Sequence, residues 1–353
     1  MSNAKTMKAA VLHALDDLRI EDVAIPTIGD NDLLIKVAYN GLCGSDASEY
    51  HKATLFVPYD KPHPNSKHVG PTILGHEFVG TVVEAGKNVA SFLGKKVACG
   101  AGVSCGNCKR CKEGRTNLCA NYYTLGLSTH GGMAEFVAAP ASTCVEIPEE
   151  MSFARAALAQ PLAVGIHGVN RAGVKAGDTV FLLGAGAIGA FVCVALRNRN
   201  VHVVAADISQ ERLNLVKDLG VDKTILITKD ATVQELKDQF GGQADVVFET
   251  SGAPDGVAKA VALTLSGGTA MLLGLNKTPQ ELVFSDPVLR EVTLQTTVAH
   301  VCMDDIPEAL ELLADGSVAK LLSGEIFKLV DSQAAFDLLL GGTSHGKILI
   351  GNG

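Results

Sequence analysis

The chain has 353 residues, of which 47% are hydrophobic and 19% are charged, and this composition is typical of a folded globular protein rather than a disordered one. Its length exceeds the usual size of one hydrophobic core, so we expect two domains. The 30 basic and 38 acidic residues give a net charge of −8, which disfavours nucleic acid or an anionic membrane as the main partner.

Short apolar segments separated by Gly, Pro and Asn run from residue 7 to about residue 150. Their spacing is strand-like, and they include MKAAVL, DLLIKVAYNGLCGSD, EFVGTVVEAG, KKVACG and AEFVAAP. Many short strands divided by turn residues predict a mostly β, barrel-like domain.

Two of these segments carry polar groups in apolar surroundings. GLCGSD contains Cys43 and Ser45, and ILGHEFVG contains His76 and Glu77. One thiolate, one imidazole and one carboxylate suit zinc, and three protein ligands leave a coordination position open, although each residue taken singly also fits a core position. Zinc there would polarise a carbonyl or acidify an alcohol, so the set predicts interconversion of the two, with Ser45 passing the hydroxyl proton towards solvent.

Four of the nine cysteines lie within fifteen residues, in CGNCKRCKEGRTNLC. Their spacing is C-x2-C-x2-C-x7-C, and they are Cys105, Cys108, Cys111 and Cys119. Four thiolates close a tetrahedral site without an open position, which is typical of structural zinc. An iron–sulfur cluster is the alternative, but the spacing favours zinc. With no secretory signal in view, we expect metal binding in a reducing cytoplasm rather than disulfides.

After a stretch with helical spacing, SFARAALAQPLAVGIHGVNRAG, strand-like and helix-like segments alternate. This alternation predicts a parallel sheet with right-handed crossovers. Three glycines in the apolar stretch 179–196 favour a strand, a tight turn and a helix there over a membrane span. From about residue 299 the tail mixes a helix with strand-like pieces, which either extend this sheet or return to the first domain.

The segment FLLGAGAIGAF places Gly184, Gly186 and Gly189 in the pattern G-x-G-x-x-G, between an apolar strand and a helix. Such glycines let a pyrophosphate approach the backbone, and the unpaired N–H groups of the first helical residues, Ala187 and Ile188, favour the anion. The segment therefore predicts a dinucleotide site; the alternative is a glycine-rich turn without a ligand.

Asp207 ends the next predicted strand, 23 residues after Gly184. An acid in this place binds the adenosine ribose hydroxyls and repels a 2′-phosphate, which predicts NAD rather than NADP. Arg212 qualifies the prediction because a cation nearby could accept that phosphate, unless Arg212 only stacks on the adenine.

In this order and over nearly the whole chain, GLCGSD, GHE, the four-cysteine loop and GAGAIG resemble the zinc-dependent medium-chain alcohol dehydrogenase family. The resemblance implies an α/β protein with a GroES-like, mostly β catalytic domain over residues 1–161 and 299–353. It implies a Rossmann domain, a doubly wound parallel sheet that binds NAD, over residues 162–298. It further implies two zinc ions per chain, one catalytic and one structural, and a homodimer or homotetramer.

The resemblance also implies catalytic zinc on Cys43 and His76, with Glu77 as ligand or near neighbour and Asp46 orienting His76. Two positions depart from the family pattern. Ser48 stands where many relatives carry a proton-relay histidine, and His51 is either its substitute or a surface residue. Gln160 stands where polyol-type relatives carry a glutamate before PL, so we expect it at the zinc; a core hydrogen bond is the alternative.

The insertion LFVPYDKPHPNSKHVGPTILGHE resembles the butanediol dehydrogenase branch, near the sorbitol and threonine dehydrogenases. This implies a small secondary alcohol, vicinal diol or polyol as substrate. We therefore expect a cytoplasmic zinc-dependent oxidoreductase that transfers a hydride between NAD and such an alcohol or its ketone. A non-catalytic dinucleotide-binding relic of the same scaffold and an NADPH-dependent ketone reductase are the alternatives.

Overall fold

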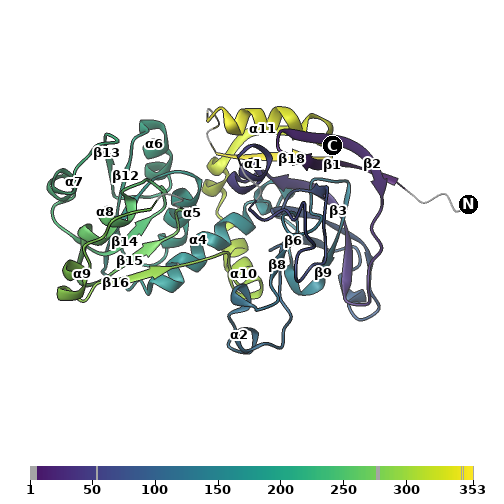
Figure 1. Ribbon diagram of the computed structural model, residues 1–353, viewed down its shortest axis with the longest axis horizontal. Helices are drawn as coiled ribbons and strands as arrows, with labels where there is room; N and C mark the ends of the chain where they lie inside the picture. Colours follow the sequence, from purple (N-terminus) through teal and green to yellow (C-terminus); the bar gives the residue numbers. More distant parts are fainter. Residues whose placement is uncertain (1–5, 53–54, 276–278, 343, 345, 353) are drawn as a thin grey trace, which may run out of the picture. The chain divides into compact units, whose positions relative to one another are not determined.

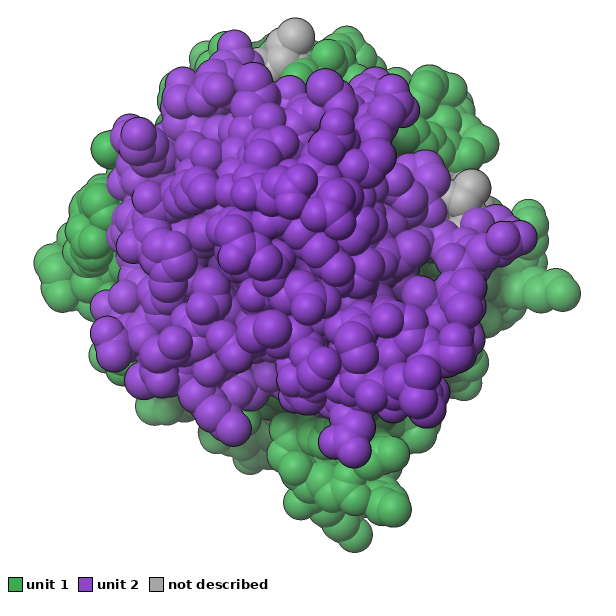
Figure 2. Space-filling view, turned by 90° about the vertical axis from the view of Figure 1, so that its left-hand side faces the viewer, with its two compact units in different colours: residues 1–163, 300–353 green, residues 164–299 purple. Residues whose placement is uncertain are grey.

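The computed structural model describes residues 6–52, 55–275, 279–342, 344 and 346–352 (Figure 1). The chain divides into two compact units, of which unit 1 comprises residues 1–163 and 300–353 and unit 2 residues 164–299 (Figure 2). The sequence suggested borders at 161/162 and 298/299, and the borders between the units are 163/164 and 299/300.

Unit 1 is mostly β, as predicted. Its main sheet has the order β10-β6-β5-β3-β18-β17, with β9 also paired to β3, and two smaller sheets have the orders β2-β1-β4 and β7-β8. The strands of the main sheet are β3 (Asp32–Gly41), β5 (Phe78–Ala85), β6 (Lys96–Cys99), β9 (Phe136–Pro140), β10 (Cys144–Glu146), β17 (Leu322–Lys328) and β18 (Lys347–Gly351). The smaller sheets contain β1 (Thr6–Ala14), β2 (Asp17–Ala24), β4 (Thr72–Ile73), β7 (Gly102–Val103) and β8 (Tyr123–Thr124).

The helices of unit 1 are α1 (Gly44–His51), α2 (Lys109–Lys112), α3 (Phe153–Ala156), α10 (Cys302–Leu313), α11 (Ser332–Leu340) and the start of α4 (Ala159–Ala172). Short 3₁₀ turns cover Ala90–Phe92, Thr116–Leu118, Ala141–Thr143, Gly316–Leu321 and Leu329–Asp331. The predicted strand-like run through GLCGSD is wrong beyond residue 41, because α1 begins at Gly44. Asp46 caps this helix by accepting the N–H of Cys43, so the end of the run is helical.

The tail returns to unit 1 rather than extending the other sheet. Strand β18 pairs antiparallel with β3, where Ile350 lies opposite Asn40, and β17 pairs parallel with β18. This pairing resolves the two alternatives left open by the sequence pattern.

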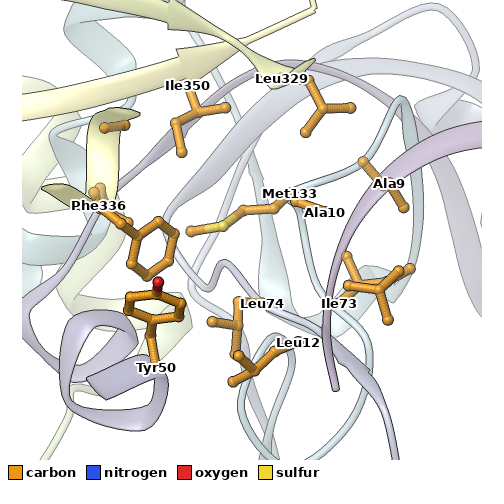
Figure 3. Close-up of a cluster of buried hydrophobic side chains, with 14 of the residues drawn as sticks. Ala9, Ala10, Leu12, Tyr50, Ile73, Leu74, Met133, Leu329, Phe336 and Ile350 are labelled. Carbon is orange, nitrogen blue, oxygen red and sulfur yellow. The ribbon is translucent and has the colours of Figure 1, made fainter. Parts of the chain in front are cut away.

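A buried cluster ties the tail to α1 (Figure 3). Tyr50 of α1 packs against Phe336 of α11 with ring centroids 5.1 Å apart, and Met133 reaches towards Phe336. Such aromatic burial is worth about 2 kcal/mol per side chain, so it anchors the helix that Cys43 precedes and whose first turn carries Asp46.

Unit 2 is a six-stranded parallel sheet of order β13-β12-β11-β14-β15-β16. Its strands are β11 (Thr179–Leu183), β12 (His202–Asp207), β13 (Lys223–Leu226), β14 (Ala244–Glu249), β15 (Thr264–Leu272) and β16 (Thr293–Thr296). Its helices, apart from the rest of α4, are α5 (Ala187–Leu196), α6 (Gln210–Asp218), α7 (Val233–Phe240), α8 (Gly256–Leu263) and α9 (Ser285–Leu289).

The strand order of unit 2 reverses between β11 and β14, as in a doubly wound sheet. The predicted alternation of strands and helices is therefore confirmed, and the apolar stretch 179–196 divides into β11 and α5. No helix in the described part of the chain is both long enough and apolar enough to span a membrane.

Candidate metal and nucleotide sites

Cys43 lies directly before the first turn of α1, where the end of β3 passes into the helix. Its backbone N–H donates to Asp46 Oδ2 at 2.9 Å, which fixes the fully buried Asp46 beneath the half-buried thiol. The helix cap thus orients two of the predicted site residues at once.

His76 follows β4 and lies between two side chains from the first turn of α1. Its Nδ1 is 3.3 Å from Asp46 Oδ1, and its Nε2 is 3.2 Å from the hydroxyl oxygen of Ser45. Burial lowers the pKa of His76, but Asp46 and the Cys43 thiol act in the opposite direction, and the pKa lies well above its usual value. A carboxylate on Nδ1 is the arrangement that orients a histidine towards a metal through Nε2.

Glu77 is fully buried and forms an ion pair with Lys347, which comes from β18 in the tail. The Lys347 ammonium donates to Glu77 Oε1 at 2.8 Å, and Oε2 lies equally close but outside hydrogen-bond geometry. The Lys347 ammonium also donates to the carbonyl of Leu42 at 3.3 Å. Burial lowers the pKa of Lys347, whereas Glu77 and Cys43 raise it, and the net pKa is above its ordinary value.

Lys347 is not among the site residues predicted from the sequence. The only signal was a lone basic residue at the start of the otherwise apolar segment KILIG, because a buried lysine almost always has an anionic partner. Nothing in the pattern identified that partner as Glu77, 270 residues earlier.

Ligand atoms of Cys43, His76 and Glu77 all lie within 4.8 Å of one another. Asp46 Oδ1 and His76 Nδ1 face each other at 3.3 Å but outside hydrogen-bond geometry, and the buried Glu77 Oε2 accepts no hydrogen bond. A soft thiolate, an imidazole and a carboxylate with a buried oxygen that accepts no hydrogen bond fit a zinc ion.

Three further predicted residues lie near the ends of helices. Gln160 is the second residue of α4 and is half-buried, and its place at the zinc stays a prediction. His51 is the last residue of α1 and half-exposed, and its Nδ1 lies 2.6 Å from Asp16 Oδ1. This contact fits the surface interpretation of His51, while Ser48 lies one turn earlier and is half-buried.

The four-cysteine loop brings its sulfur atoms together around α2. The sulfur–sulfur distances are 3.5 Å between Cys105 and Cys119, 3.6 Å between Cys108 and Cys111, and 3.9 Å between Cys108 and Cys119. Zinc–sulfur bonds of about 2.3 Å give a tetrahedron with edges of about 3.8 Å, so the four thiols already have the spacing of a zinc site.

The thiols of this loop differ in their acidity. Backbone hydrogen bonds involving Cys111 and Ala120 lower the pKa of Cys108 to about 6, whereas burial raises the pKa of Cys119 to about 11. A bound cation deprotonates coordinating thiols, so zinc would remove this difference.

The predicted dinucleotide turn joins β11 to α5. Gly184 has φ +98°, in the left-handed region that favours glycine, and a Cβ on Gly189 would lie 2.1 Å from the Gly184 carbonyl oxygen. A Cβ on Gly186, the residue before α5, would meet no atom within 4 Å. The backbone thus faces open space where Ala187 and Ile188 begin the helix, which fits a pyrophosphate.

Asp207 lies beside this turn at the end of β12 and is nearly buried. Its Oδ2 accepts the N–H of Ala185 at 2.7 Å, and its Oδ1 accepts the N–H of Ser209 at 2.8 Å. The guanidinium of Arg212 is 3.8 Å from Oδ1. Each carboxylate oxygen can accept more than one hydrogen bond, so Asp207 keeps capacity for ribose hydroxyls.

Both units match known families. Residues 29–149 match the family described as "Alcohol dehydrogenase GroES-like domain", and residues 187–315 match the one described as "Zinc-binding dehydrogenase". The predicted GroES-like and Rossmann domains are thereby confirmed.

Among characterised proteins, the chain is 32% identical to (R,R)-butanediol dehydrogenase of Bacillus subtilis over 349 residues, which cover 98% of this chain and 99% of that protein. It is 30% identical to sorbitol dehydrogenase of Bombyx mori over 347 residues, 89% of this chain and 97% of that protein.

The fold is also similar to solved structures, of which two carry a bound nicotinamide cofactor. One is a protein described as a short chain alcohol dehydrogenase from E. coli CFT073, complexed with NADH, with TM-score 0.88, 26% identity, and 98% and 99% of the two chains covered. The other is described as a zinc-binding dehydrogenase from Sinorhizobium meliloti 1021 bound to NADP, with TM-score 0.86, 29% identity and the same coverage. Together with the matched units and the four-cysteine and Cys/His/Glu sets, these similarities show that the chain belongs to the zinc-containing medium-chain alcohol dehydrogenase family.

Proposed function

We propose that the protein is an NAD-dependent dehydrogenase that interconverts a small secondary alcohol, vicinal diol or polyol with its ketone. The observation that carries this proposal is the convergence of Cys43, His76 and Glu77 in unit 1, with Ser45 and Asp46 on either side of the imidazole. The butanediol and sorbitol dehydrogenases similar to this chain support the substrate class.

Cys43 and His76 are the proposed zinc ligands, with Glu77 as a ligand or near neighbour and Gln160 as a further, neutral donor. When bound, the zinc supplies a Lewis acid that makes an alcohol oxygen more acidic. Asp46 holds Nδ1 of His76 and so fixes the direction of the ring. Ser45, whose hydroxyl oxygen already lies beside the imidazole, would accept the alcohol proton while it releases its own hydroxyl proton towards solvent.

NAD is the proposed redox partner, bound at Gly184, Gly186 and Gly189, with Asp207 on the adenosine ribose. The carboxylate of Asp207 at the end of β12 supports NAD, because it would repel the 2′-phosphate of NADP. An NADPH-dependent ketone reductase is the second candidate. Arg212, 3.8 Å from Asp207, and the NADP bound to the Sinorhizobium relative favour it.

A homo-oligomer is the proposed assembly. Large apolar side chains are exposed in one short stretch of unit 2, next to the edge strand β16: Val283, Phe284, Val288, Leu289, Leu294 and Val298. Several large exposed apolar side chains close to the edge of a sheet suit an interface, and a second copy of the chain would cover them.

The decisive experiment replaces Cys43 by Ala. We expect turnover to be lost while NAD still binds, because the dinucleotide turn belongs to the other unit. The same samples are analysed for zinc: about two ions per unaltered chain and one in the variant support the enzyme. Turnover retained by the variant contradicts the zinc mechanism, and one ion in the unaltered chain supports the non-catalytic relic.

Activity with a panel of diols, polyols and simple secondary alcohols, measured with NAD and with NADP, then tests the substrate class and the cofactor. A clear preference for NADPH in ketone reduction would favour the second candidate.

A further inference from the structure

Glu249 is a buried carboxylate that the proposed function leaves unexplained. It is the last residue of β14 and only 1% exposed. Its Oε1 accepts the N–H groups of Ser251 and Gly252, each at 2.9 Å, and the hydroxyl of Ser251. No ion pair within the described residues involves Glu249, so these charge-assisted hydrogen bonds compensate for its burial.

Two glycines make room for this carboxylate. A Cβ on Gly256 would lie 2.8 Å from Glu249 Oε1, and a Cβ on Gly274 would lie 2.3 Å from Oε2. The backbone therefore encloses the charged group from two sides, which keeps water away and lets its field act over a longer distance.

Glu249 lies next to the dinucleotide turn. In the sheet it is opposite Leu183, the residue before Gly184. The following residue, Thr250, donates its N–H to the Leu183 carbonyl at 2.9 Å and its hydroxyl to the Gly184 carbonyl at 2.7 Å. Since the strand order reverses between β11 and β14, both turns border the crevice in which doubly wound sheets bind dinucleotides.

The two turns offer opposite charge to a ligand. The turn after β11 ends in the first N–H groups of α5, which lack intrahelical acceptors and favour a pyrophosphate. In the turn after β14, the N–H groups of Ser251 and Gly252 donate to the Glu249 carboxylate and are not free for an anion. The β14 side of the crevice therefore presents a negative charge instead. The second half of a dinucleotide lies over this side of the sheet.

We propose that Glu249 determines which oxidation state of the cofactor the protein prefers. The nicotinamide ring is a cation in the oxidised cofactor and neutral in the reduced one, so a buried anion on this side of the crevice favours the oxidised form. This inference rests on the proposed use of a nicotinamide dinucleotide. It makes Glu249 a specificity-determining residue without contact to the reacting atoms.

The test replaces Glu249 by Gln, which keeps an oxygen acceptor of the same size and removes the charge. The Kd values of NAD⁺ and NADH are measured for the full zinc-loaded chain by calorimetry and NADH fluorescence. We expect the Kd of NAD⁺ to rise about threefold to tenfold more than that of NADH, as Coulomb attraction in a partly shielded site predicts. A change by the same factor for both nucleotides, or no change, overturns the proposal.

Thr250→Val is the matched control. It removes the hydrogen bond to Gly184 but no charge, so a purely structural effect should raise both Kd values by one factor. Glu249→Asp keeps the charge, so the ratio of the two Kd values should stay within about twofold of that of the unaltered chain, even if both Kd values rise. A larger change of this ratio contradicts the proposal. This variant therefore tests the proposal even if Glu249→Gln does not fold. If the unaltered chain binds neither nucleotide, the proposed function fails rather than the role of Glu249.

Discussion

The ion pair between Glu77 and Lys347 changes the charge of the proposed zinc site. From the sequence, Cys43 and Glu77 together would balance the two charges of the zinc. In the structure the Glu77 carboxylate is already neutralised by a buried ammonium at 2.8 Å. If the amide of Gln160 takes the proposed place of a carboxylate at the zinc, Cys43 would be the one anionic ligand whose charge remains available, and the centre would be more electrophilic.

Replacing Lys347 by Met should leave Glu77 buried without a cation. Removing one partner of a buried ion pair lowers the free energy of unfolding by about 3–5 kcal/mol, and urea denaturation measures this decrease. Glu77→Gln alone should also destabilise, because it leaves the ammonium unpaired. The double variant should be more stable than the sum of the two single effects predicts, by about 1–3 kcal/mol. Strictly additive effects would mean that the two side chains do not interact in the folded protein.

Replacing Gln160 by Glu should keep the fold and change zinc retention or turnover severalfold. A second anionic ligand binds zinc more firmly but makes it a weaker Lewis acid. Zinc content after dialysis against a chelator and kcat with the best alcohol are the measurements. Gln239→Glu, an exposed change of the same charge on α7, is the control. If both variants behave like the unaltered chain, Gln160 is a core residue rather than a zinc ligand.

At the scale of single elements, the turn from β11 to α5 shows how a local motif makes a ligand site. Its first glycine is required by a positive φ and its third by the close approach of two backbone segments. Its middle glycine, Gly186, is required by neither, since a Cβ there would meet only open space and its φ of −66° suits any residue. The fold therefore does not require a glycine at this position, which suits a pyrophosphate that approaches the backbone there.

Gly186→Ala should therefore leave the thermal midpoint of unfolding unchanged and weaken NAD binding at least tenfold, because the methyl group occupies the space of the pyrophosphate. Gly189→Ala should lower the thermal midpoint, since its methyl group would collide with the Gly184 carbonyl oxygen. Differential scanning calorimetry and NADH fluorescence separate the two effects. Unchanged NAD affinity in Gly186→Ala would place the pyrophosphate elsewhere.

At the scale of the whole molecule, segments far apart in sequence build each unit. The tail supplies β18 to the sheet of β3, and with it Lys347 to the site formed by residues 43–77. In unit 2 the edge strand β16 and the neighbouring α9 present apolar side chains, of which Leu289 is 84% exposed. This combination predicts association through that edge.

Leu289→Lys should therefore shift the protein towards a monomer in analytical ultracentrifugation, because a charge would be buried in the interface of each copy. Leu226→Lys is the matched control. Leu226 ends β13, the opposite edge of the same sheet, and is 53% exposed. If Leu289→Lys leaves the sedimentation coefficient unchanged, this face is not the interface; an effect of Leu226→Lys instead would assign the contact to the other edge.

Much of the fold and part of the site could be predicted from the sequence because their signals are local. The strands and helices of unit 2, the spacing of the four cysteines and the G-x-G-x-x-G turn all lie within short segments. Within GLCGSD, by contrast, the strand-like pattern gave the wrong element after residue 41, because one capping side chain, Asp46, decides where α1 begins.

The sequence by itself therefore determined the two-domain α/β architecture, the four-thiol metal loop and the dinucleotide turn. Only the tertiary structure decided where the tail returns, that Lys347 neutralises Glu77, and that Glu249 is enclosed beside Gly184. The physical reason is that helix caps, turns and chelating loops are made of neighbours in the chain. Buried charges are balanced by partners that only long-range packing brings within hydrogen-bond distance.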